Sequence, residues 1–407
     1  MRTSAVFTIV LAVACGGGTA EWSGTVEELP GGGRWVRNPA GGVWDSRGGD
    51  GWRLEEELRI GEVEGDGPTV FGSVSGVFVD PWDRLHVIEG QAHEIRVFGA
   101  DGTPLRVVGR EGEGPGEFRG PNGIVWDAAG TMWVADGLQG RRYTRFDTAG
   151  TVLETHVGES RALGFGGFAG GLTPDGVLYD TDLLVPEGAG ANPLFAAAGL
   201  GGGRMILRAM LDVAGEPVTD TVPLPAPRTE PVTFSTTGLT MSAPFNPRMH
   251  WRFDPRGHVW FGESDAYRIH QRSFAGDTVR IIEREYSPLP VRQEDIDEWL
   301  ESRMATRFRE AGGRLDVGRV PKVKPVFDNI IIDDAGHLWV RLVTHDDAVV
   351  FDVFDPEGRY LGAVEGGAEM ATITPVIHGD RFYGVVRDSL DIPYVVRYRI
   401  LGREIAP

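Results

Sequence analysis

The sequence predicts an all-β fold, a closed ring of small antiparallel sheets, and a recurring phrase carries this prediction. Each copy has an Asp, two turn residues, usually a Gly, and then a short apolar strand that often contains an aromatic side chain. The copies lie at residues 80–87, 127–134, 254–261 and 333–340, and the first two are about 47 residues apart. Repeats of this length, with several short strands in each unit, are typical of a β-propeller.

Composition and apolar spacing support the same fold class. The chain has 59 Gly in 407 residues, which is about twice the usual share and suits a fold with many tight turns. Residues 293–309 are the one strongly helical stretch, with these apolar positions: Ile296, Trp299, Leu300, Met304 and Phe308. We therefore predict one helical insertion, which packs onto the ring, docks to a partner or partly covers the central channel.

Side-by-side alignment of the units predicts six blades, so the expected fold is a six-bladed β-propeller. The units cover residues 74–109, 122–157, 173–222, 251–282, 329–364 and 374–401. The last unit is one strand short, and residues 52–60 form a strand pattern that lies before the first unit. We predict that this strand completes the last blade as its outer strand, which would join the two ends of the chain and protect a sheet edge.

The long connections between predicted strands all fall on one face of the ring, here called the long-loop face. They are residues 110–121, 182–203, 223–249 and 287–326. Successive connections within a blade alternate between the two faces, so the short turns occupy the opposite face. Because binding residues tend to lie on variable loops held by a rigid scaffold, we predict that the long-loop face is the binding surface.

The start of the chain is predicted to target the protein to the cell envelope. Three segments are expected: a lipoprotein signal peptide (1–14), a flexible Gly-rich tether (15–50) and the propeller (51–407). The first segment combines Arg2 with an apolar run that is too short to span a bilayer. Its end, LAVAC, resembles a bacterial lipobox, in which cleavage leaves a lipid on Cys15, the single cysteine. A plain secreted protein and an uncleaved cytoplasmic start are the alternatives.

The second unit and the connection before it closely resemble the NHL-repeat family. The resemblance lies in GEGPGEFRGPNGI at residues 112–124, WVAD at 133–136 and RFD at 145–147. It implies a six-bladed β-propeller of the kind found in bacterial lipoproteins. Such a scaffold often binds proteins or other ligands, and membership of the family does not by itself imply catalysis.

Candidate site residues lie near the starts of first strands and the ends of second strands, where propeller enzymes usually work. On the long-loop face these positions hold Glu89, Asn122, Asp136, His250, Glu263, Asp328, Asn329 and Arg341. Carboxylates and amides that converge on the channel could hold Ca²⁺, and gluconolactonase-like and strictosidine-synthase-like propellers have a site in a comparable region. The alternative is that these side chains cap loops, as the Asp at position 136 does in the repeat family.

Several classes of function are disfavoured by the sequence. The formal charge of −19 repels phosphate backbones, so nucleic acid is not an expected partner. The chain has no His-Glu-x-x-His motif, no cysteine pair, no Gly-x-Ser-x-Gly elbow and no phosphate-binding loop. No catalytic residue is therefore assigned.

We accordingly favour a non-enzymatic binding or scaffold propeller over an enzyme. The lipid on Cys15 would be its only membrane contact, and the protein would be periplasmic or surface-exposed. Its long-loop face would bind an envelope protein or a small molecule. A Ca²⁺-dependent lactonase or hydrolase at the channel mouth is the alternative, and a small-molecule sensor within an envelope complex is a third hypothesis. No cofactor is expected apart from Ca²⁺ in the second case.

Overall fold

The computed structural model describes residues 22–403 of the chain, apart from several gaps. The gaps are residues 47–50, 138–141, 158–170, 174, 185–203, 212–217, 219–220, 226, 255, 347, 367–369 and 371–372. The predicted signal peptide and its lipid site, Cys15, lie outside the described residues. Within the described residues, no helix has the length and apolar character needed to cross a bilayer.

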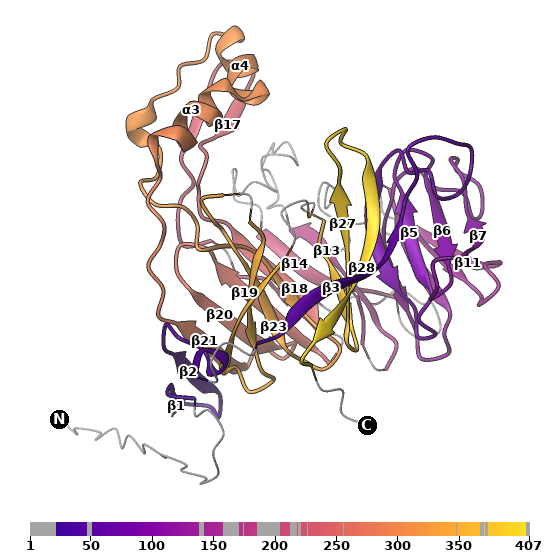
Figure 1. Ribbon diagram of the computed structural model, residues 1–407, viewed down its shortest axis with the longest axis horizontal. Coiled ribbons are helices and arrows are strands. Elements are labelled where there is room, and N and C mark those ends of the chain that lie inside the picture. Colours follow the sequence, from indigo (N-terminus) through magenta and orange to yellow (C-terminus); the bar gives the residue numbers. More distant parts are fainter. Residues whose placement is uncertain are drawn as a thin grey trace.

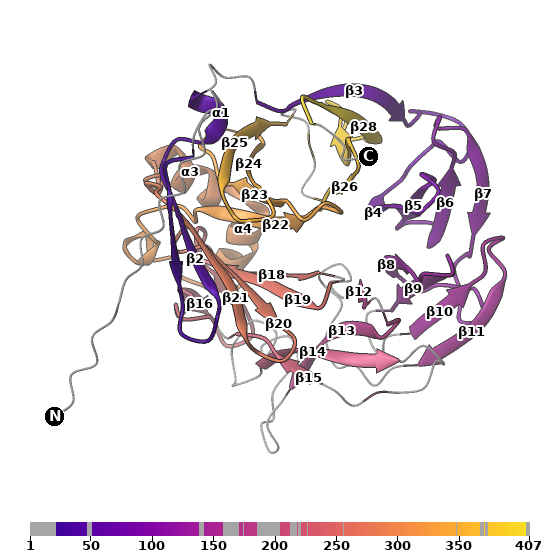
Figure 2. The ribbon, with the colours of Figure 1, turned by 90° about the horizontal axis from the view of Figure 1, so that it is seen from below.

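Five four-stranded sheets and one six-stranded sheet are arranged in a ring around a central opening, with the first strand of each sheet nearest the centre (Figure 2). This arrangement confirms the predicted all-β propeller. Sheet 1 contains β4 (Val74–Val79), β5 (Leu85–Glu89), β6 (Glu94–Phe98) and β7 (Pro104–Val108). Sheet 2 contains β8 (Pro121–Trp126), β9 (Met132–Asp136), β10 (Arg142–Phe146) and β11 (Val152–Val157). Sheet 3 contains β12 (Gly171–Leu172), β13 (Leu178–Leu184), β14 (Arg204–Leu211) and β15 (Thr221–Pro223).

The remaining three sheets complete the ring. Sheet 4 contains β18 (Met249–Asp254), β19 (His258–Glu263), β20 (Arg268–Ser273) and β21 (Thr278–Arg284), extended by β2 (Arg34–Asn38) and β1 (Thr25–Glu28). Sheet 5 contains β22 (Phe327–Ile332), β23 (Leu338–Leu342), β24 (Val350–Phe354) and β25 (Tyr360–Glu365). Sheet 6 contains β26 (Val376–His378), β27 (Arg381–Arg387), β28 (Pro393–Leu401) and β3 (Arg53–Ile60).

The predicted count of six blades is not met: the structure has five four-stranded blades, and the remaining sheet of the ring, sheet 4, has six strands. In this sheet β2 pairs in parallel with the outer strand β21, and the register places Arg34 opposite Arg280 and Asn38 opposite Arg284. Sheet 4 differs from the predicted blade because an N-terminal hairpin, which is not part of the repeat, adds to the free edge of β21.

The same hairpin overturns part of the predicted flexible tether over residues 15–50. Residues 25–46 form β1, β2 and the short helix α1 (Val43–Ser46), and Val36 and Trp44 are buried. The buried Asn38 amide donates to the carbonyls of Glu283 and Gly358 at 2.9 and 3.0 Å, and its oxygen accepts from the Tyr360 amide at 2.7 Å. The tether prediction is wrong here because it rests on the Gly-rich composition of the segment as a whole. Composition does not show that single side chains such as Val36, Asn38 and Trp44 are buried against the propeller.

The ring closes in the way that the sequence predicts. The strand β3 is the outer strand of sheet 6 and pairs antiparallel with β28, with Arg53 opposite Leu401 and Ile60 opposite Val395. Figure 2 shows β3 and β28 side by side, although they come from opposite ends of the chain. Ile60 is buried and Leu54 packs against the core of sheets 5 and 6, so the closing strand is held by apolar contacts as well as by its ladder.

The Asp of the recurring phrase closes the turn between the first and second strands. Asp127 Oδ1 accepts from the backbone amides of Ala129 and Thr131 at 3.0 and 2.9 Å. Gly130 has a φ of 79°, which glycine adopts without strain. Asp80 accepts the same two bonds, whereas Asp254 accepts from the Arg256 amide and Asp333 from the His337 amide. The repeat in the sequence is thus a repeat of one Asp-locked turn.

Two of the long connections fold together into a lobe that projects above the ring (Figure 1). The lobe contains the hairpin β16 (Thr233–Ser235) and β17 (Thr240–Ser242), helices α3 (Gln293–Glu301) and α4 (Arg303–Glu310), and a 3-10 helix (Val317–Arg319). Ile296 and Phe308 of the helices pack against Phe234 and Met241 of the hairpin. The lobe therefore has a hydrophobic core of its own.

The helical insertion predicted at residues 293–309 is confirmed in position and differs in two respects. The helix is broken at Ser302, which has an extended ψ of 148° and whose hydroxyl accepts from the Ala305 amide, so that α4 starts anew. The expectation that it packs onto the ring is wrong, because its buried side chains face the hairpin. Met304, which was expected in the apolar stripe, is 55% exposed.

Candidate functional site

Three of the predicted carboxylates, Glu89, Asp136 and Glu263, end the second strands of sheets 1, 2 and 4 and are buried. Each accepts hydrogen bonds from two consecutive backbone amides of the segment before its own sheet: Gly72 and Ser73 for Glu89, Arg119 and Gly120 for Asp136, and Arg228 and Thr229 for Glu263. The distances range from 2.7 to 2.9 Å. These side chains cap loops, which was the alternative interpretation of the sequence.

Electrostatics agree with a capping role for Glu263. Burial alone would raise the pKa of this carboxyl, but hydrogen bonds from the backbone amides of Arg228 and Thr229 hold it below its usual value. A carboxylate whose oxygens are already engaged by amides has few lone pairs left for a metal ion. Among the described residues, no three His, Cys, Asp or Glu side chains lie close enough together to hold a metal.

Asn122 and Asp328 occupy equivalent positions in different sheets. Each is the extra residue of a bulge at the start of a first strand, between Pro121 and Gly123 in β8 and between Phe327 and Asn329 in β22. Both amide atoms of Asn122 are buried without a hydrogen-bond partner. Asp328 instead lines a cavity, so the structure separates these two predicted residues.

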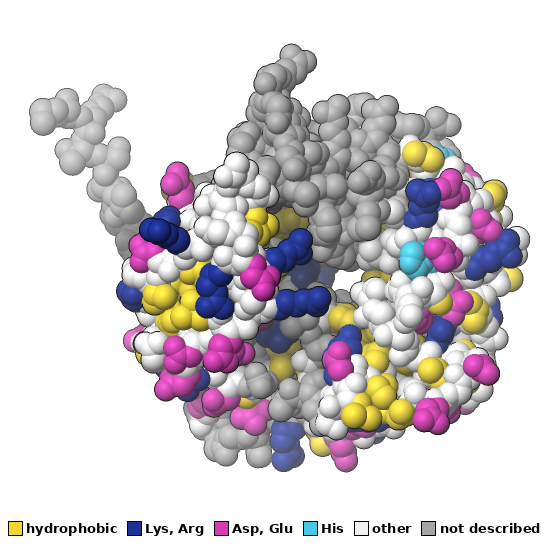
Figure 3. Space-filling model, turned by 90° about the horizontal axis from the view of Figure 1, so that it is seen from above, with side chains coloured by type: hydrophobic (Ala, Val, Ile, Leu, Met, Phe, Trp, Pro, Cys, Tyr) yellow, Lys and Arg dark blue, Asp and Glu magenta, His cyan; other side chains and the backbone are white. Residues whose placement is uncertain are grey.

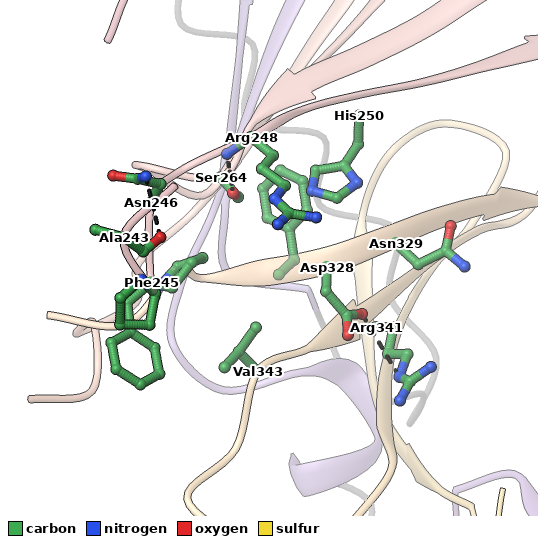
Figure 4. Close-up of a pocket in the computed structure, with 13 residues that line it drawn as sticks. Ala243, Phe245, Asn246, Arg248, His250, Ser264, Asp328, Asn329, Arg341 and Val343 are labelled. Atoms are coloured by element: carbon green, nitrogen blue, oxygen red, sulfur yellow. Dashed lines mark hydrogen bonds and ion pairs between the residues drawn. The ribbon is translucent and has the colours of Figure 1, made fainter. Parts of the chain in front are cut away.

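Asp328, Asn329, Arg341 and His250 are brought together in one cavity of about 380 Å³ between sheets 4 and 5 (Figure 4). The other lining residues are Ala243, Pro244, Phe245, Asn246, Arg248, Ser264, Pro325, Phe327 and Val343. The volume is in the range of small-molecule pockets. The cavity therefore unites half of the predicted site residues with a segment that returns from the lobe.

The strand register explains why the polar side chains meet between these two sheets. His250 lies opposite Gly262 in sheet 4, and Asn329 lies opposite Arg341 in sheet 5. The corresponding first-strand positions of sheets 1 and 2 are glycines, Gly76 and Gly123. Sheets 4 and 5 therefore present polar side chains where sheets 1 and 2 have none.

Arginine side chains surround this cavity. Arg248 is exposed, and its guanidinium has no ionic partner within the described part of the chain. Arg341 Nε lies 3.5 Å from Asp328 Oδ1, and this is the one ion pair between described residues of the pocket lining. Figure 3 shows Lys and Arg side chains at the rim of the central opening. The mouth of the channel is thus locally cationic in a protein with a formal charge of −19.

A further arginine, Arg252, lies behind the pocket and contacts its lining. Its guanidinium donates to the carbonyl of Trp251, the amide oxygen of Asn329 and the hydroxyl of Thr374. All three acceptors are neutral, and burial lowers the pKa of Arg252 to about 10, so the group stays cationic at neutral pH. Arg252 occupies a strand position that is apolar in other sheets, such as Val125 in β8. An arginine at an otherwise apolar position of the repeat is the sequence signal that could have identified Arg252 as a candidate site residue.

The two titratable groups of the pocket are shifted in opposite senses. Burial, followed by the charges of Arg252 and Arg248, lowers the pKa of His250 to about 4, so its imidazole is neutral at pH 7. Burial raises the pKa of Asp328, while Arg341 opposes that shift. A neutral imidazole beside two guanidinium groups offers hydrogen bonds without adding charge.

No family model matches the sequence, and no curated protein is similar to it. Among solved structures, a DUF4221 family member from Bacteroides vulgatus is 9% identical over 88% of this chain and 99% of its own, with a TM-score of 0.52. A protein of Bacteroides fragilis inferred to be exported is 10% identical over 85% and 95%, with a TM-score of 0.47. A gluconolactonase from Xanthomonas campestris is 13% identical over 86% and 95%, with a TM-score of 0.39. At these identities the likeness shows the β-propeller fold alone.

Proposed function

We propose that this protein is a non-enzymatic binding propeller whose long-loop face captures a small anionic ligand in the pocket between sheets 4 and 5. The observation that supports this proposal is the pair Arg248 and Arg252, two guanidinium groups beside the cavity without a carboxylate partner in the described part of the chain. Arg252 is half-buried, and a half-buried cation is normally paired, so its lack of a carboxylate partner among the described residues favours an anionic ligand nearby. The exposed Arg248 lines the cavity and offers its guanidinium to the same ligand.

The surrounding charge makes this arrangement informative. The chain carries 59 acidic and 40 basic side chains, yet among the described residues Asp328 is the only carboxylate that lines the cavity, and Arg341 already pairs with it. Guanidinium groups bind carboxylates and phosphates through two parallel hydrogen bonds, which gives orientation as well as affinity. The pocket supplies binding groups and, in Asp328 and His250, no nucleophile paired with a base, so we propose binding rather than turnover.

Calorimetric titration with sodium acetate and sodium phosphate tests the proposal. We expect saturable heat for at least one anion, and a loss of about tenfold or more in affinity for Arg248→Gln. Arg303→Gln is the matched control, because Arg303 is an exposed arginine on the lobe that does not line the pocket. Absence of saturable binding to the wild-type protein, or an equal loss in both variants, would overturn the proposal.

Envelope anchoring is part of the same proposal. The LAVAC stretch at residues 11–15 supports a lipid on Cys15. The protein would be an NHL-like propeller in which sheet 4 counts as the sixth blade, and this supports a periplasmic or surface-exposed scaffold. Its partner would be a small molecule or an envelope protein on the long-loop face. Expression of Cys15→Ala tests the anchor: the variant should leave the membrane fraction, and an unchanged distribution would refute it.

A Ca²⁺-dependent lactonase or hydrolase at the channel mouth is the second candidate. It is favoured by Asn122, whose amide atoms are buried and unpartnered, and by the equivalent position of Asp328 in sheet 5. The capping roles of Glu89, Asp136 and Glu263 weigh against it. Tight Ca²⁺ binding by calorimetry that Asp328→Asn abolishes would favour this candidate. If Ca²⁺ produces neither heat in calorimetry nor a thermal shift, the binding proposal stays in place.

A further inference from the structure

We infer that the ligand of the pocket between sheets 4 and 5 is a monocarboxylate with an apolar body. This inference rests on the proposed anion site and adds the chemical class of the ligand. It follows from the way in which the lining separates into a polar side and an apolar side.

The polar side comes from the ring. Arg248 and His250 belong to β18 and the residues just before it, and Asn329 belongs to β22. In Figure 4 these side chains lie above and to the right of the cavity, with the Arg248 guanidinium next to the His250 ring. This guanidinium also helps to lower the pKa of His250, although burial and the charge of Arg252 contribute more. An anionic head group at this side would meet the free fork of Arg248.

The apolar side comes from the segment that returns from the lobe and from the loop after β23. Phe245 and Val343 lie together on the other side of the cavity (Figure 4). Pro244 and Pro325 add further apolar surface. Ala243 and Phe327 are buried, and Phe327 packs against the His250 ring with ring centres 5.4 Å apart, so they contribute little to this side. A small inorganic anion would leave this surface in contact with water, whereas an attached hydrocarbon would cover it.

The apolar side is held in place by the lobe. Phe245 has a φ of 60°, a left-handed conformation that is rare for an aromatic residue and that the surroundings must enforce. Its ring packs with the lobe core, and Lys324 Nζ lies 5.7 Å from the ring centre. Lys324 in turn forms a buried ion pair with Asp295 of α3 at 2.8 Å. The strained residue is therefore fixed on the lining of the cavity by contacts that lie outside it.

The charge of the ligand is limited by Asp328. This carboxyl lines the same cavity and forms an ion pair with Arg341. It therefore neutralises the charge of Arg341 and repels further negative charge. Arg252 does not line the cavity, so among the described lining residues Arg248 is the arginine without an ion pair. A group with a single negative charge on Arg248 is compatible with Asp328, whereas a dianionic phosphate is disfavoured. The geometry thus points to a carboxylate.

Titration with a matched set of probes tests this inference: hexanoate, acetate, hexanol and inorganic phosphate. Each methylene transferred from water into an apolar pocket adds about fourfold in affinity. We expect hexanoate to bind at least about tenfold more tightly than acetate, and more tightly than hexanol or phosphate. Val343→Ser should weaken hexanoate by about threefold or more and weaken acetate less than hexanoate. Val317→Ser, an equivalent change on the lobe surface, should affect neither.

The outcomes separate this inference from the proposed function. Equal affinities for hexanoate and acetate, or tighter binding of phosphate, would overturn the inference and leave the anion site in place. Tight hexanol binding would also overturn it, because the carboxylate would then be dispensable. If no anion binds at all, both proposals fail. Thermal unfolding of each variant shows whether it is folded, and Phe245→Ala serves as a second test of the apolar side if Val343→Ser is unstable.

Discussion

Asp333 Oδ2 accepts a hydrogen bond from the indole Nε1 of Trp339 at 3.1 Å, and both side chains are fully buried in sheet 5. The same six-residue relationship recurs in other sheets, between Asp254 and Trp260 and between Asp80 and His86. The Asp of the recurring phrase therefore locks its own turn and also bonds the second strand that follows. This double role explains why the Asp and the aromatic side chain repeat together.

Replacement of Asp333 by Ala should be strongly destabilising. The change leaves Trp339 Nε1 without its acceptor. It also removes the nearer carboxylate of the buried Arg403 guanidinium, which lies 2.9 Å from Asp333 Oδ2 and 3.6 Å from Asp334 Oδ1. Breaking a buried ion pair on one side costs about 3–5 kcal/mol. The urea midpoint, followed by tryptophan fluorescence, measures this loss. Asp101→Ala, which removes an exposed turn carboxylate, should shift the midpoint far less, and equal shifts would contradict the double role of Asp333.

Asn38→Ala tests whether the N-terminal hairpin is an integral part of the fold. The variant leaves the carbonyls of Glu283 and Gly358 and the amide of Tyr360 without the Asn38 side chain. Buried groups that lose their partners cost about 1–3 kcal/mol. We expect a comparable loss of stability and faster proteolytic release of residues 22–46. Arg34→Ala removes only an exposed ion pair with Glu28, so it should change neither the stability nor the rate of proteolytic release.

Two truncations should separate the hairpin from the closing strand. A chain that begins at residue 52 lacks β1 and β2 but keeps β3, whereas a chain that begins at residue 62 lacks all three strands. Both truncations expose the edge of β21, which then ends its sheet as β7, β11 and β25 end theirs. Only the second also exposes β28, a strand that is normally paired on both sides, so it should self-associate or aggregate more than the first. Light scattering after size exclusion measures this. A monomeric, folded protein from residue 62 onward would show that ring closure does not depend on β3.

The repeat makes most of the fold predictable from the sequence, and the same repeat limits the prediction of the site. Residues 52–60 form a strand pattern without partners nearby, and the incomplete last unit identifies where they pair. Sequence position alone treats Glu89 and Asp328 alike, because both lie at the channel end of a strand. The structure distinguishes them, since loop amides engage Glu89 whereas Asp328 lines the cavity.

Three features lie beyond what the sequence pattern reveals. The hairpin β1–β2 is hidden by its Gly-rich surroundings, because composition does not show that β21 offers it a free edge. The lobe requires contact between two connections that are far apart in the chain, here through Phe234 and Phe308. Arg248 belongs to a connection without periodicity, so only its position beside His250 indicates a role.

Acidification should destabilise the protein through histidines that are held neutral. Burial, with the charges of nearby arginines, lowers the pKa of His250 and of His270 to about 4, against 6.5 for an ordinary histidine. Below pH 6.5 the unfolded chain takes up protons that the folded chain does not, so stability is lost as the pH falls. At pH 5 each histidine should cost about 2 kcal/mol relative to pH 7.

His270→Gln isolates this effect, because His270 stacks on Phe261 with ring centres 5.0 Å apart and lies outside the pocket. The variant should lose less stability than the wild type between pH 7 and 5 when urea midpoints are compared. His378 provides the opposite control: its hydrogen bond with Asp334 raises its pKa, so it stabilises the fold at low pH and loses this effect as the pH rises. His378→Gln should therefore steepen the loss of stability on acidification. If both variants follow the wild-type profile, protonation of these histidines does not control the acid response.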